Sequence, residues 1–161
     1  MSSYVQFYLR MNETFILITD YSRNSTVYKF VAPDAPYGKI KPVTLDMIEN
    51  YVSNAVDRIA EIEEYIAKER SRISFIMDAK GNSLEEKLDY LEGINNLIKD
   101  DENEKECVRK AICFFGVLED MIDNHKYCSE QFKDFKNDFN HYIYIGEESE
   151  GNLESIEEGY E

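Results

Sequence analysis

The 161-residue chain has no tryptophan, three prolines, seven glycines and three cysteines. An odd number of cysteines without framework spacing argues against a disulfide scaffold, so Cys107, Cys113 and Cys128 are expected to be reduced thiols in a cytoplasmic protein. No apolar run reaches the roughly 18 residues that span a bilayer. The N-terminal residues lack the basic and apolar regions of a secretory signal. We therefore expect no contact with a membrane.

Basic residues are also scarce, since 18 Lys and Arg face 33 Asp and Glu and the net charge is −15. Residues 1–43 hold five basic and three acidic residues, whereas residues 44–161 hold 13 basic and 30 acidic residues. Such a chain repels nucleic acid and attracts basic protein surfaces. The acidic part has two interpretations: a solvated helical surface, or a face that imitates nucleic acid in the basic groove of a partner.

The most regular pattern lies between Thr44 and Met77, where apolar residues recur at alternating steps of four and three. This mean spacing of 3.5 residues predicts a long helix that packs along a partner helix, as in a coiled coil. The stripe consists of Ile48, Val52, Ala55, Ile59, Ile62, Ile66, Glu69, Ile73 and Ile76. If the chain does not cover this stripe itself, its isoleucines and valine form a self-association site, and we expect a homodimer.

Three further helices are predicted after this stripe. A break at Asp78–Asn82 and a capping box at Ser83–Glu86 indicate a second, antiparallel helix over about residues 84–99. Its inner face is expected to consist of Leu84, Leu88, Leu91, Ile94 or Asn95, and Ile98. The acidic run Asp100–Glu104 is expected to turn the chain into a third helix, and a fourth is expected from residue 129. The third helix has an apolar face made of Val108, Ala111, Ile112, Phe115, Leu118, Met121, Ile122 and His125.

The N-terminal region predicts strands. Residues 4–10 and 14–19 are rich in aromatic and β-branched residues and indicate a hairpin, to which Thr26–Phe30 is expected to add a third strand. The predicted class is therefore α+β in one structural domain. Its parts are an antiparallel sheet (1–31), a Pro/Gly linker (32–43), a helical region with a coiled-coil-like hairpin (44–141), a candidate further strand of the sheet (142–146) and a disordered acidic tail (147–161).

The sequence predicts no catalytic residue, no metal site and no cofactor. Cys107 and Cys113 lie six residues apart on a helix and therefore face different sides, which does not suit zinc. We expect Cys113 to be a core thiol instead. A cysteine–histidine pair with Cys128 or Cys113 would lack the electropositive neighbours that activate a thiolate.

One loop offers a candidate binding site, because it carries basic charge on an acidic protein. Its residues are Tyr21, Ser22 and Arg23, with Lys39 and Lys41 further along the chain. One interpretation is an ordinary strand connection in which Ser and Asn bind their own backbone. The other is a small site for an anionic ligand or a protein, with Arg23 as a fork-shaped donor.

The segments Tyr4–Arg10, Asp20–Arg23 and Pro36–Ile40, with Phe15 and Ile16, resemble a group of small uncharacterised proteins carried by phages and integrative elements of low-GC Gram-positive bacteria. This resemblance implies an accessory protein of a mobile element and supplies no activity or site residues. We expect a non-enzymatic acidic module that binds and inhibits a host protein with a basic surface, such as a nucleic-acid-binding or defence protein. The alternatives are a protein that sequesters a small anionic ligand and a structural homo-oligomer of the element.

Overall fold

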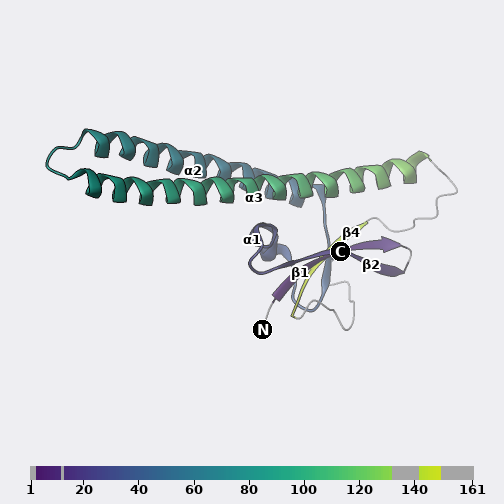
Figure 1. The fold of residues 1–161 in the computed structure, drawn as a ribbon. Coiled ribbons are helices and arrows are strands. Elements are labelled where there is room, and N and C mark those ends of the chain that lie inside the picture. Colours follow the sequence, from purple (N-terminus) through teal and green to yellow (C-terminus); the bar gives the residue numbers. More distant parts are fainter. Residues whose placement is uncertain (1–2, 12, 132–141, 150–161) are drawn as a thin grey trace. The chain divides into compact units, whose positions relative to one another are not determined.

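The computed structural model describes residues 3–11, 13–131 and 142–149, and the chain divides into two compact units (Figure 1). The first unit comprises Met1–Asn54 and Ala111–Glu161, and the second comprises Ala55–Lys110. The two long helices, α2 (Leu45–Asp78) and α3 (Leu84–Gln131), each contribute to both units. The fold class is α+β, as predicted.

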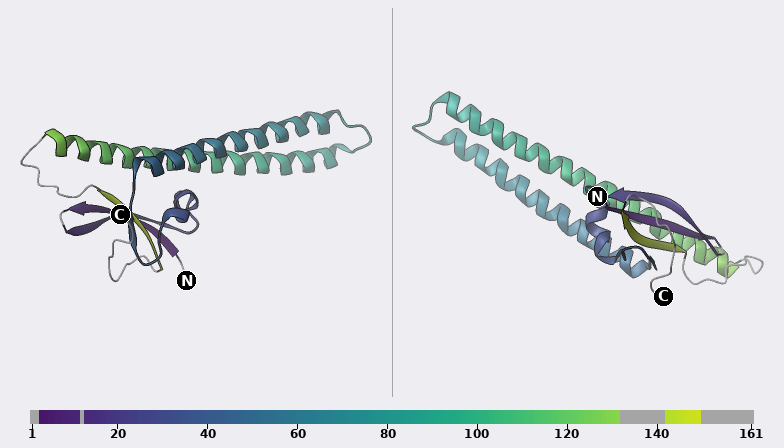
Figure 2. Two further views of the ribbon diagram at one scale, coloured as in Figure 1. Left: turned by 180° about the vertical axis from the view of Figure 1, so that it is seen from behind. Right: turned by 90° about the horizontal axis from the view of Figure 1, so that it is seen from below.

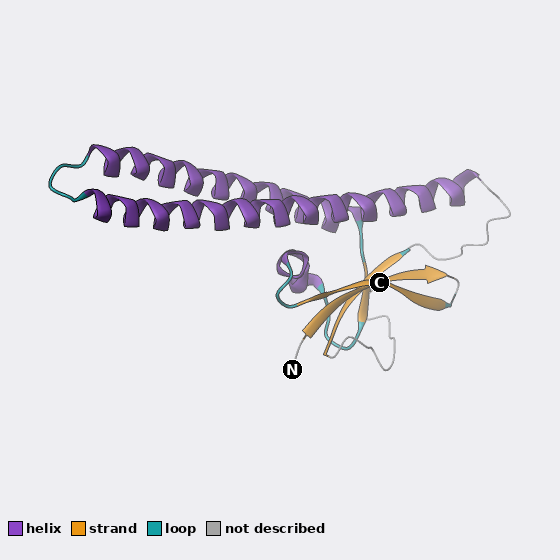
Figure 3. Cartoon of the chain, viewed as in Figure 1, coloured by secondary structure: helices purple, strands orange, loops and turns teal. Residues whose placement is uncertain are grey.

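The first unit contains a four-stranded antiparallel sheet in the order β2-β1-β4-β3. Its strands are coloured orange in Figure 3. Strand β1 pairs with β2 on one side and with β4 on the other, so the predicted C-terminal strand does join the N-terminal sheet. β4 also includes the first three residues of the predicted disordered tail, and the rest of that tail lies outside the described residues. The strands are β1 (Ser3–Met11), β2 (Thr14–Ser22), β3 (Ile40–Pro42) and β4 (Ile143–Ser149).

One predicted strand is wrong, because Thr26–Phe30 belongs to the short helix α1 (Thr26–Val31). Ser25 caps this helix, since its Oγ accepts a hydrogen bond from the backbone N–H of Tyr28 at 3.2 Å. The helix buries two valines that lie four residues apart, Val27 and Val31. The cap and this buried face outweigh the strand preference of β-branched residues. The sheet instead takes its short edge strand, β3, from the predicted linker.

The core of the first unit lies between one face of the sheet and the helices. Strand β1 contributes Val5 and Phe7, and the sheet register places Phe7 opposite Ile145 of β4. The inner face predicted for residues 108–125 is confirmed, since all eight of its side chains are buried or partly buried. The two long helices contribute Ile48 and Tyr51 from α2 and Ala111, Phe115, Leu118 and Ile122 from α3 to this core, beside Val27 and Val31 of α1.

The second unit is an antiparallel hairpin in which α2 and α3 lie side by side in each view (Figure 2). The hairpin is confirmed, but the turn predicted at Asp100–Glu104 is wrong, because α3 is one helix of 48 residues. The acidic run holds neither glycine nor proline, and its glutamates pair with cations of α2. Arg58 donates to Glu104 Oε1 from Nε at 3.0 Å and from Nη2 at 2.7 Å. Arg70 lies 3.6 Å from Glu102.

The apolar stripe of α2 is largely covered within one chain. Ile48 belongs to the core of the first unit. In the second unit, Ala55, Ile62 and Ile66 are buried, and the remaining stripe residues are partly buried. Across the hairpin, Ile94 and Val108 of α3 are buried as well. The stripe therefore serves the fold of a single chain, and its use for self-association stays a prediction.

We expect Gly146→Ala to destabilise the first unit, because a Cβ at this position would overlap the backbone carbonyl of Lys39 and crowd Ile40. The backbone cannot yield without disturbing the pairing of β3 with β4, so the expected loss is about 1–3 kcal/mol of unfolding free energy. Chemical denaturation measures it. Gly116→Ala is the control, since nothing lies within 4 Å of a Cβ there; alanine inside a helix should add up to about 1 kcal/mol. Unchanged stability of G146A would contradict the close approach.

We expect Ile62→Ala to cost about 2–5 kcal/mol, because it opens a cavity where the stripe is fully buried between the helices. Val56→Ala is the matched control, since Val56 lies on the same helix but is 52% exposed. It should change stability by less than about 0.5 kcal/mol. Thermal unfolding followed by helical circular dichroism compares the two variants. Similar small effects in both would show that the stripe is not the core of the hairpin.

Candidate functional site

The five residues of the predicted anionic-ligand site do not form one cluster. They are Tyr21, Ser22, Arg23, Lys39 and Lys41. Tyr21 and Ser22 end β2, at one edge of the described sheet, whereas Lys41 belongs to β3 at the other edge. Strands β1 and β4 lie between these edges, at a spacing of about 4.8 Å per strand. The geometry therefore does not gather the three cations around one ligand.

Two members of this set have structural roles. The Tyr21 ring packs edge-on against Phe114 with ring centroids 5.1 Å apart, and burial raises the pKa of its hydroxyl. Lys41 Nζ lies 4.0 Å from the carboxylate of Asp34. Packing accounts for the position of Tyr21, and a local ion pair accounts for that of Lys41, without a bound ligand.

Arg23 is exposed directly after β2, and its surroundings already contain a carboxylate. The Tyr28 hydroxyl donates a hydrogen bond to Glu147. This bond, with burial, raises the pKa of Tyr28, while the charge of Arg23 acts in the opposite direction. Arg23 thus lies in the field of Glu147, which weakens the attraction of this loop for a free anion.

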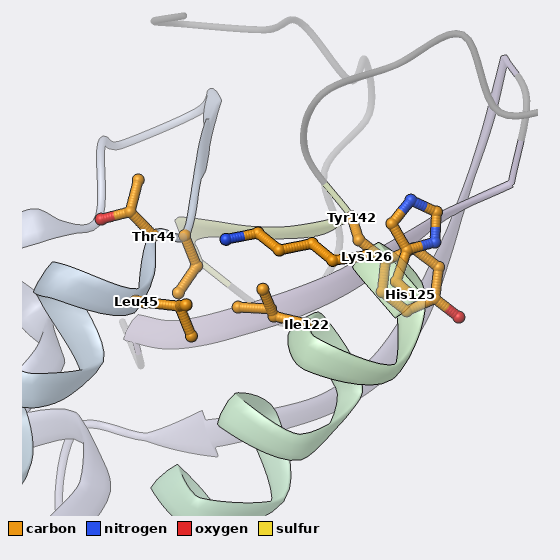
Figure 4. Close-up of a pocket in the computed structure, with 7 residues that line it drawn as sticks. Thr44, Leu45, Ile122, His125, Lys126 and Tyr142 are labelled. Carbon is orange, nitrogen blue, oxygen red and sulfur yellow. The ribbon is translucent and has the colours of Figure 1, made fainter. Parts of the chain in front are cut away.

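A small pocket lies in the first unit, where the start of α2 faces α3 (Figure 4). Its volume is about 140 Å³, below the roughly 300–1,000 Å³ of typical ligand sites. The side chain of Lys126 extends across it towards the start of α2. The described residues that line it offer neither a carboxylate nor a thiol. They are Val43, Thr44, Leu45, Ile122, His125, Lys126 and Tyr142.

His125 and Tyr142 are the two lining residues of this pocket whose pKa values are shifted by burial. The ring of His125 is buried and stacks on Tyr142, with centroids 4.2 Å apart and planes 8° from parallel. Burial lowers the pKa of His125, which favours the neutral imidazole near neutral pH. The stacked pair of His125 and Tyr142 therefore acts as packing at the end of the core.

The expected core position of Cys113 is wrong, because this thiol on α3 is exposed.

Two exposed apolar surfaces stand out, and the first is at the turn of the hairpin. We call Phe75, Met77, Leu84 and Leu88 the apolar hairpin end; all four are exposed, Phe75 by 78% and Leu84 by 74%. Of the inner face predicted for this helix, Leu91, Ile94 and Ile98 are confirmed as buried or partly buried, whereas Leu84 and Leu88 are wrong because both are exposed. Ser83 caps α3 as predicted, by accepting a hydrogen bond from Glu86 N–H at 3.2 Å.

Acidic residues surround the apolar hairpin end. Five carboxylates and two ammonium groups lie between residues 75 and 92, and Lys87 donates to the Met77 carbonyl at 3.4 Å. The local net charge is therefore negative. The carboxylates belong to Asp78, Glu85, Glu86, Asp89 and Glu92, and the ammonium groups to Lys80 and Lys87.

The second apolar surface is on the edge strand β2. Ile16 and Leu17 are each 45% exposed, and Ile18 is exposed as well. A register shift leaves Ile18 without a partner on β1, so the alternation of side chains is interrupted there. Sequence reasoning found this strand but not its edge position, which depends on where β4 pairs.

No family model, no curated protein and no solved structure matches the chain. In the part of the chain that the structure describes, no three His, Cys, Asp or Glu side chains converge as a metal site would require. Within the same residues, neither long helix contains a segment apolar enough to cross a membrane. The function must therefore be inferred from the surfaces of the chain itself.

We expect an NMR titration to give His125 a pKa below the ordinary value of about 6.5. Because the unfolded chain then binds this proton more readily, the stability from neutral His125 is present above the unfolded pKa and is lost as the pH falls from there through the lower folded pKa. His125→Phe keeps a ring against Tyr142 and removes the titration. The stability of this variant should fall less than that of the wild type between about pH 7.5 and 5.5. A His125 pKa at or above the ordinary value would contradict the burial effect.

Proposed function

We propose that this protein is a non-enzymatic binding module that contacts a partner protein through the apolar hairpin end. The observation that carries the proposal is the exposure of four large apolar side chains around one turn. Scattered apolar residues are normal on a surface, but a group of them within an acidic rim is typical of an interaction site.

The energetics favour a protein partner with an apolar groove. Fully burying a Phe, Leu or Met side chain contributes about 1.5–3 kcal/mol, and a few such anchors supply most of the affinity in many interfaces. Phe75 and Leu84 are the most exposed members of the group and therefore gain most from burial. The surrounding carboxylates favour a groove with basic side chains at its rim, because opposite charges accelerate association and select the partner.

The class of partner follows from charge and from the resemblance to phage and integrative-element proteins. A host protein that binds nucleic acid offers a basic surface, and occupation of that surface by an acidic protein inhibits it. We therefore propose an inhibitor of a host nucleic-acid-binding or defence protein that works in the bacterial cytoplasm. The apolar anchors supply affinity, while the acidic rim guides the approach.

We expect Phe75→Ser with Leu84→Ser to weaken capture of the partner at least about tenfold, because each anchor is worth 1.4 kcal/mol or more when buried. The test immobilises the wild type and the double variant, applies Gram-positive bacterial lysate and compares the captured proteins by quantitative mass spectrometry. Val56→Ser is the matched control, since it removes an exposed apolar residue of α2 elsewhere in the hairpin.

The supporting result is a protein with a basic surface that the wild type and V56S capture equally and the double variant loses. Its capture should also decrease with added salt, as expected for a charged rim. Equal capture by all three proteins, or no selective capture at all, would overturn the proposal. Circular dichroism checks that the variants fold, since exposed substitutions should change stability by less than about 0.5 kcal/mol.

A further inference from the structure

Strand β2 has an open edge. In the described part of the chain, this nine-residue strand pairs with β1 on one side and has no strand on its other side. Such an edge presents backbone N–H and C=O groups that can pair with another strand. Its exposed run Ile16–Ile18 adds apolar side chains to that backbone.

The usual protection of an edge strand is weak here. Natural edges carry lysine, proline or inward-pointing charges, or are kept very short. β2 has no lysine and no proline, and Asp20 is its one charged residue. The bulge at Ile18 is one protective feature, because it interrupts the regular ladder. The bulged residue is apolar and exposed rather than charged, so it can still contact another chain.

The charges at the ends of β2 point to a second copy of the same chain. Glu13 directly precedes the strand and Arg23 directly follows it, and both are exposed. Antiparallel alignment of two β2 strands brings Glu13 of each copy near Arg23 of the other, whereas parallel alignment brings like charges together. Nine residues lie between them, and Asp20 is the one charged residue among these nine. In a chain of net charge −15, such a stretch is a place where two copies can meet with little repulsion.

We propose that two copies associate through their β2 edges, antiparallel and about a twofold axis. The contact is isologous, because the same surface is used by both copies. It joins the two four-stranded sheets into one continuous sheet. Nine residues from each copy is fewer than the roughly 20–30 of a standard interface, so dissociation occurs at micromolar concentration. The dimer is independent of the proposed partner binding and carries two hairpins, which strengthens attachment to a partner with repeated sites.

The first test is the molar mass from light scattering over a concentration series up to about 100 µM. We expect the wild type to approach twice the 18.9 kDa of one chain. Ile18→Lys and Ile16→Lys should stay at the mass of one chain, because a charge on the edge opposes pairing. Val56→Lys adds the same charge in the second unit and should dimerise like the wild type. A monomeric wild type, or a dimer that persists in I18K and I16K, would overturn the proposal.

The second test exchanges the end charges. Glu13→Arg alone and Arg23→Glu alone each put like charges together at both ends of the paired strands and should weaken dimerisation about tenfold. The double variant E13R/R23E restores the opposite pairing and should recover the wild-type dissociation constant. Failure of the double variant to recover would overturn the antiparallel arrangement. Because both substituted residues are exposed, circular dichroism should show the same fold in all three variants.

Discussion

The structure of the first unit depends on the pairing of β1 with β4. This pairing joins residues from the two ends of the sequence, since Phe7 lies opposite Ile145. Closing so long a loop is entropically costly, although the cost grows only slowly with length. The gain comes from the face that the pairing creates, where Val5, Phe7, Ile143 and Ile145 meet the helical residues of the core. Without this pairing, β1 and β2 would form an isolated hairpin, which is marginal in water.

The second unit is stabilised differently. Its buried apolar residues form a narrow seam, and ion pairs such as Arg58 with Glu104 lie along the seam at partly exposed positions. Exposed ion pairs contribute little each, so the seam supplies most of the stability of the hairpin. The apolar hairpin end lies outside that seam, and folding of the hairpin leaves it in solvent. Phe75 and Leu84 therefore represent apolar surface that the fold itself does not use.

Patterns that repeat over many residues were predictable from the sequence. The stripe of α2 and the inner face of residues 108–125 have a helical period that no competing structure shares, and the capping box at Ser83 is a specific signal for a helix start. Short segments were not predictable in the same way. Thr26–Phe30 has the composition of a strand, but the Ser25 cap and the contacts with the core make this segment a helix. The acidic run at 100–104 looked like a turn because its partners on α2 are distant in sequence. The separation of Arg23 from Lys41 also depends on contacts between distant parts of the sequence, because it follows from the order of the strands in the sheet.

The distribution of charge along the chain bears on the two interpretations of the acidic sequence. Residues 55–110 hold 15 acidic and ten basic residues, and several of these form ion pairs within the hairpin. Residues 132–161 hold nine acidic and two basic residues, so a large share of the excess lies outside the hairpin. A uniform imitation of nucleic acid by the hairpin surface is therefore disfavoured. The proposed function instead relies on the apolar hairpin end and its local acidic rim, where burial of Phe75 and Leu84 would provide affinity and charge would provide selection.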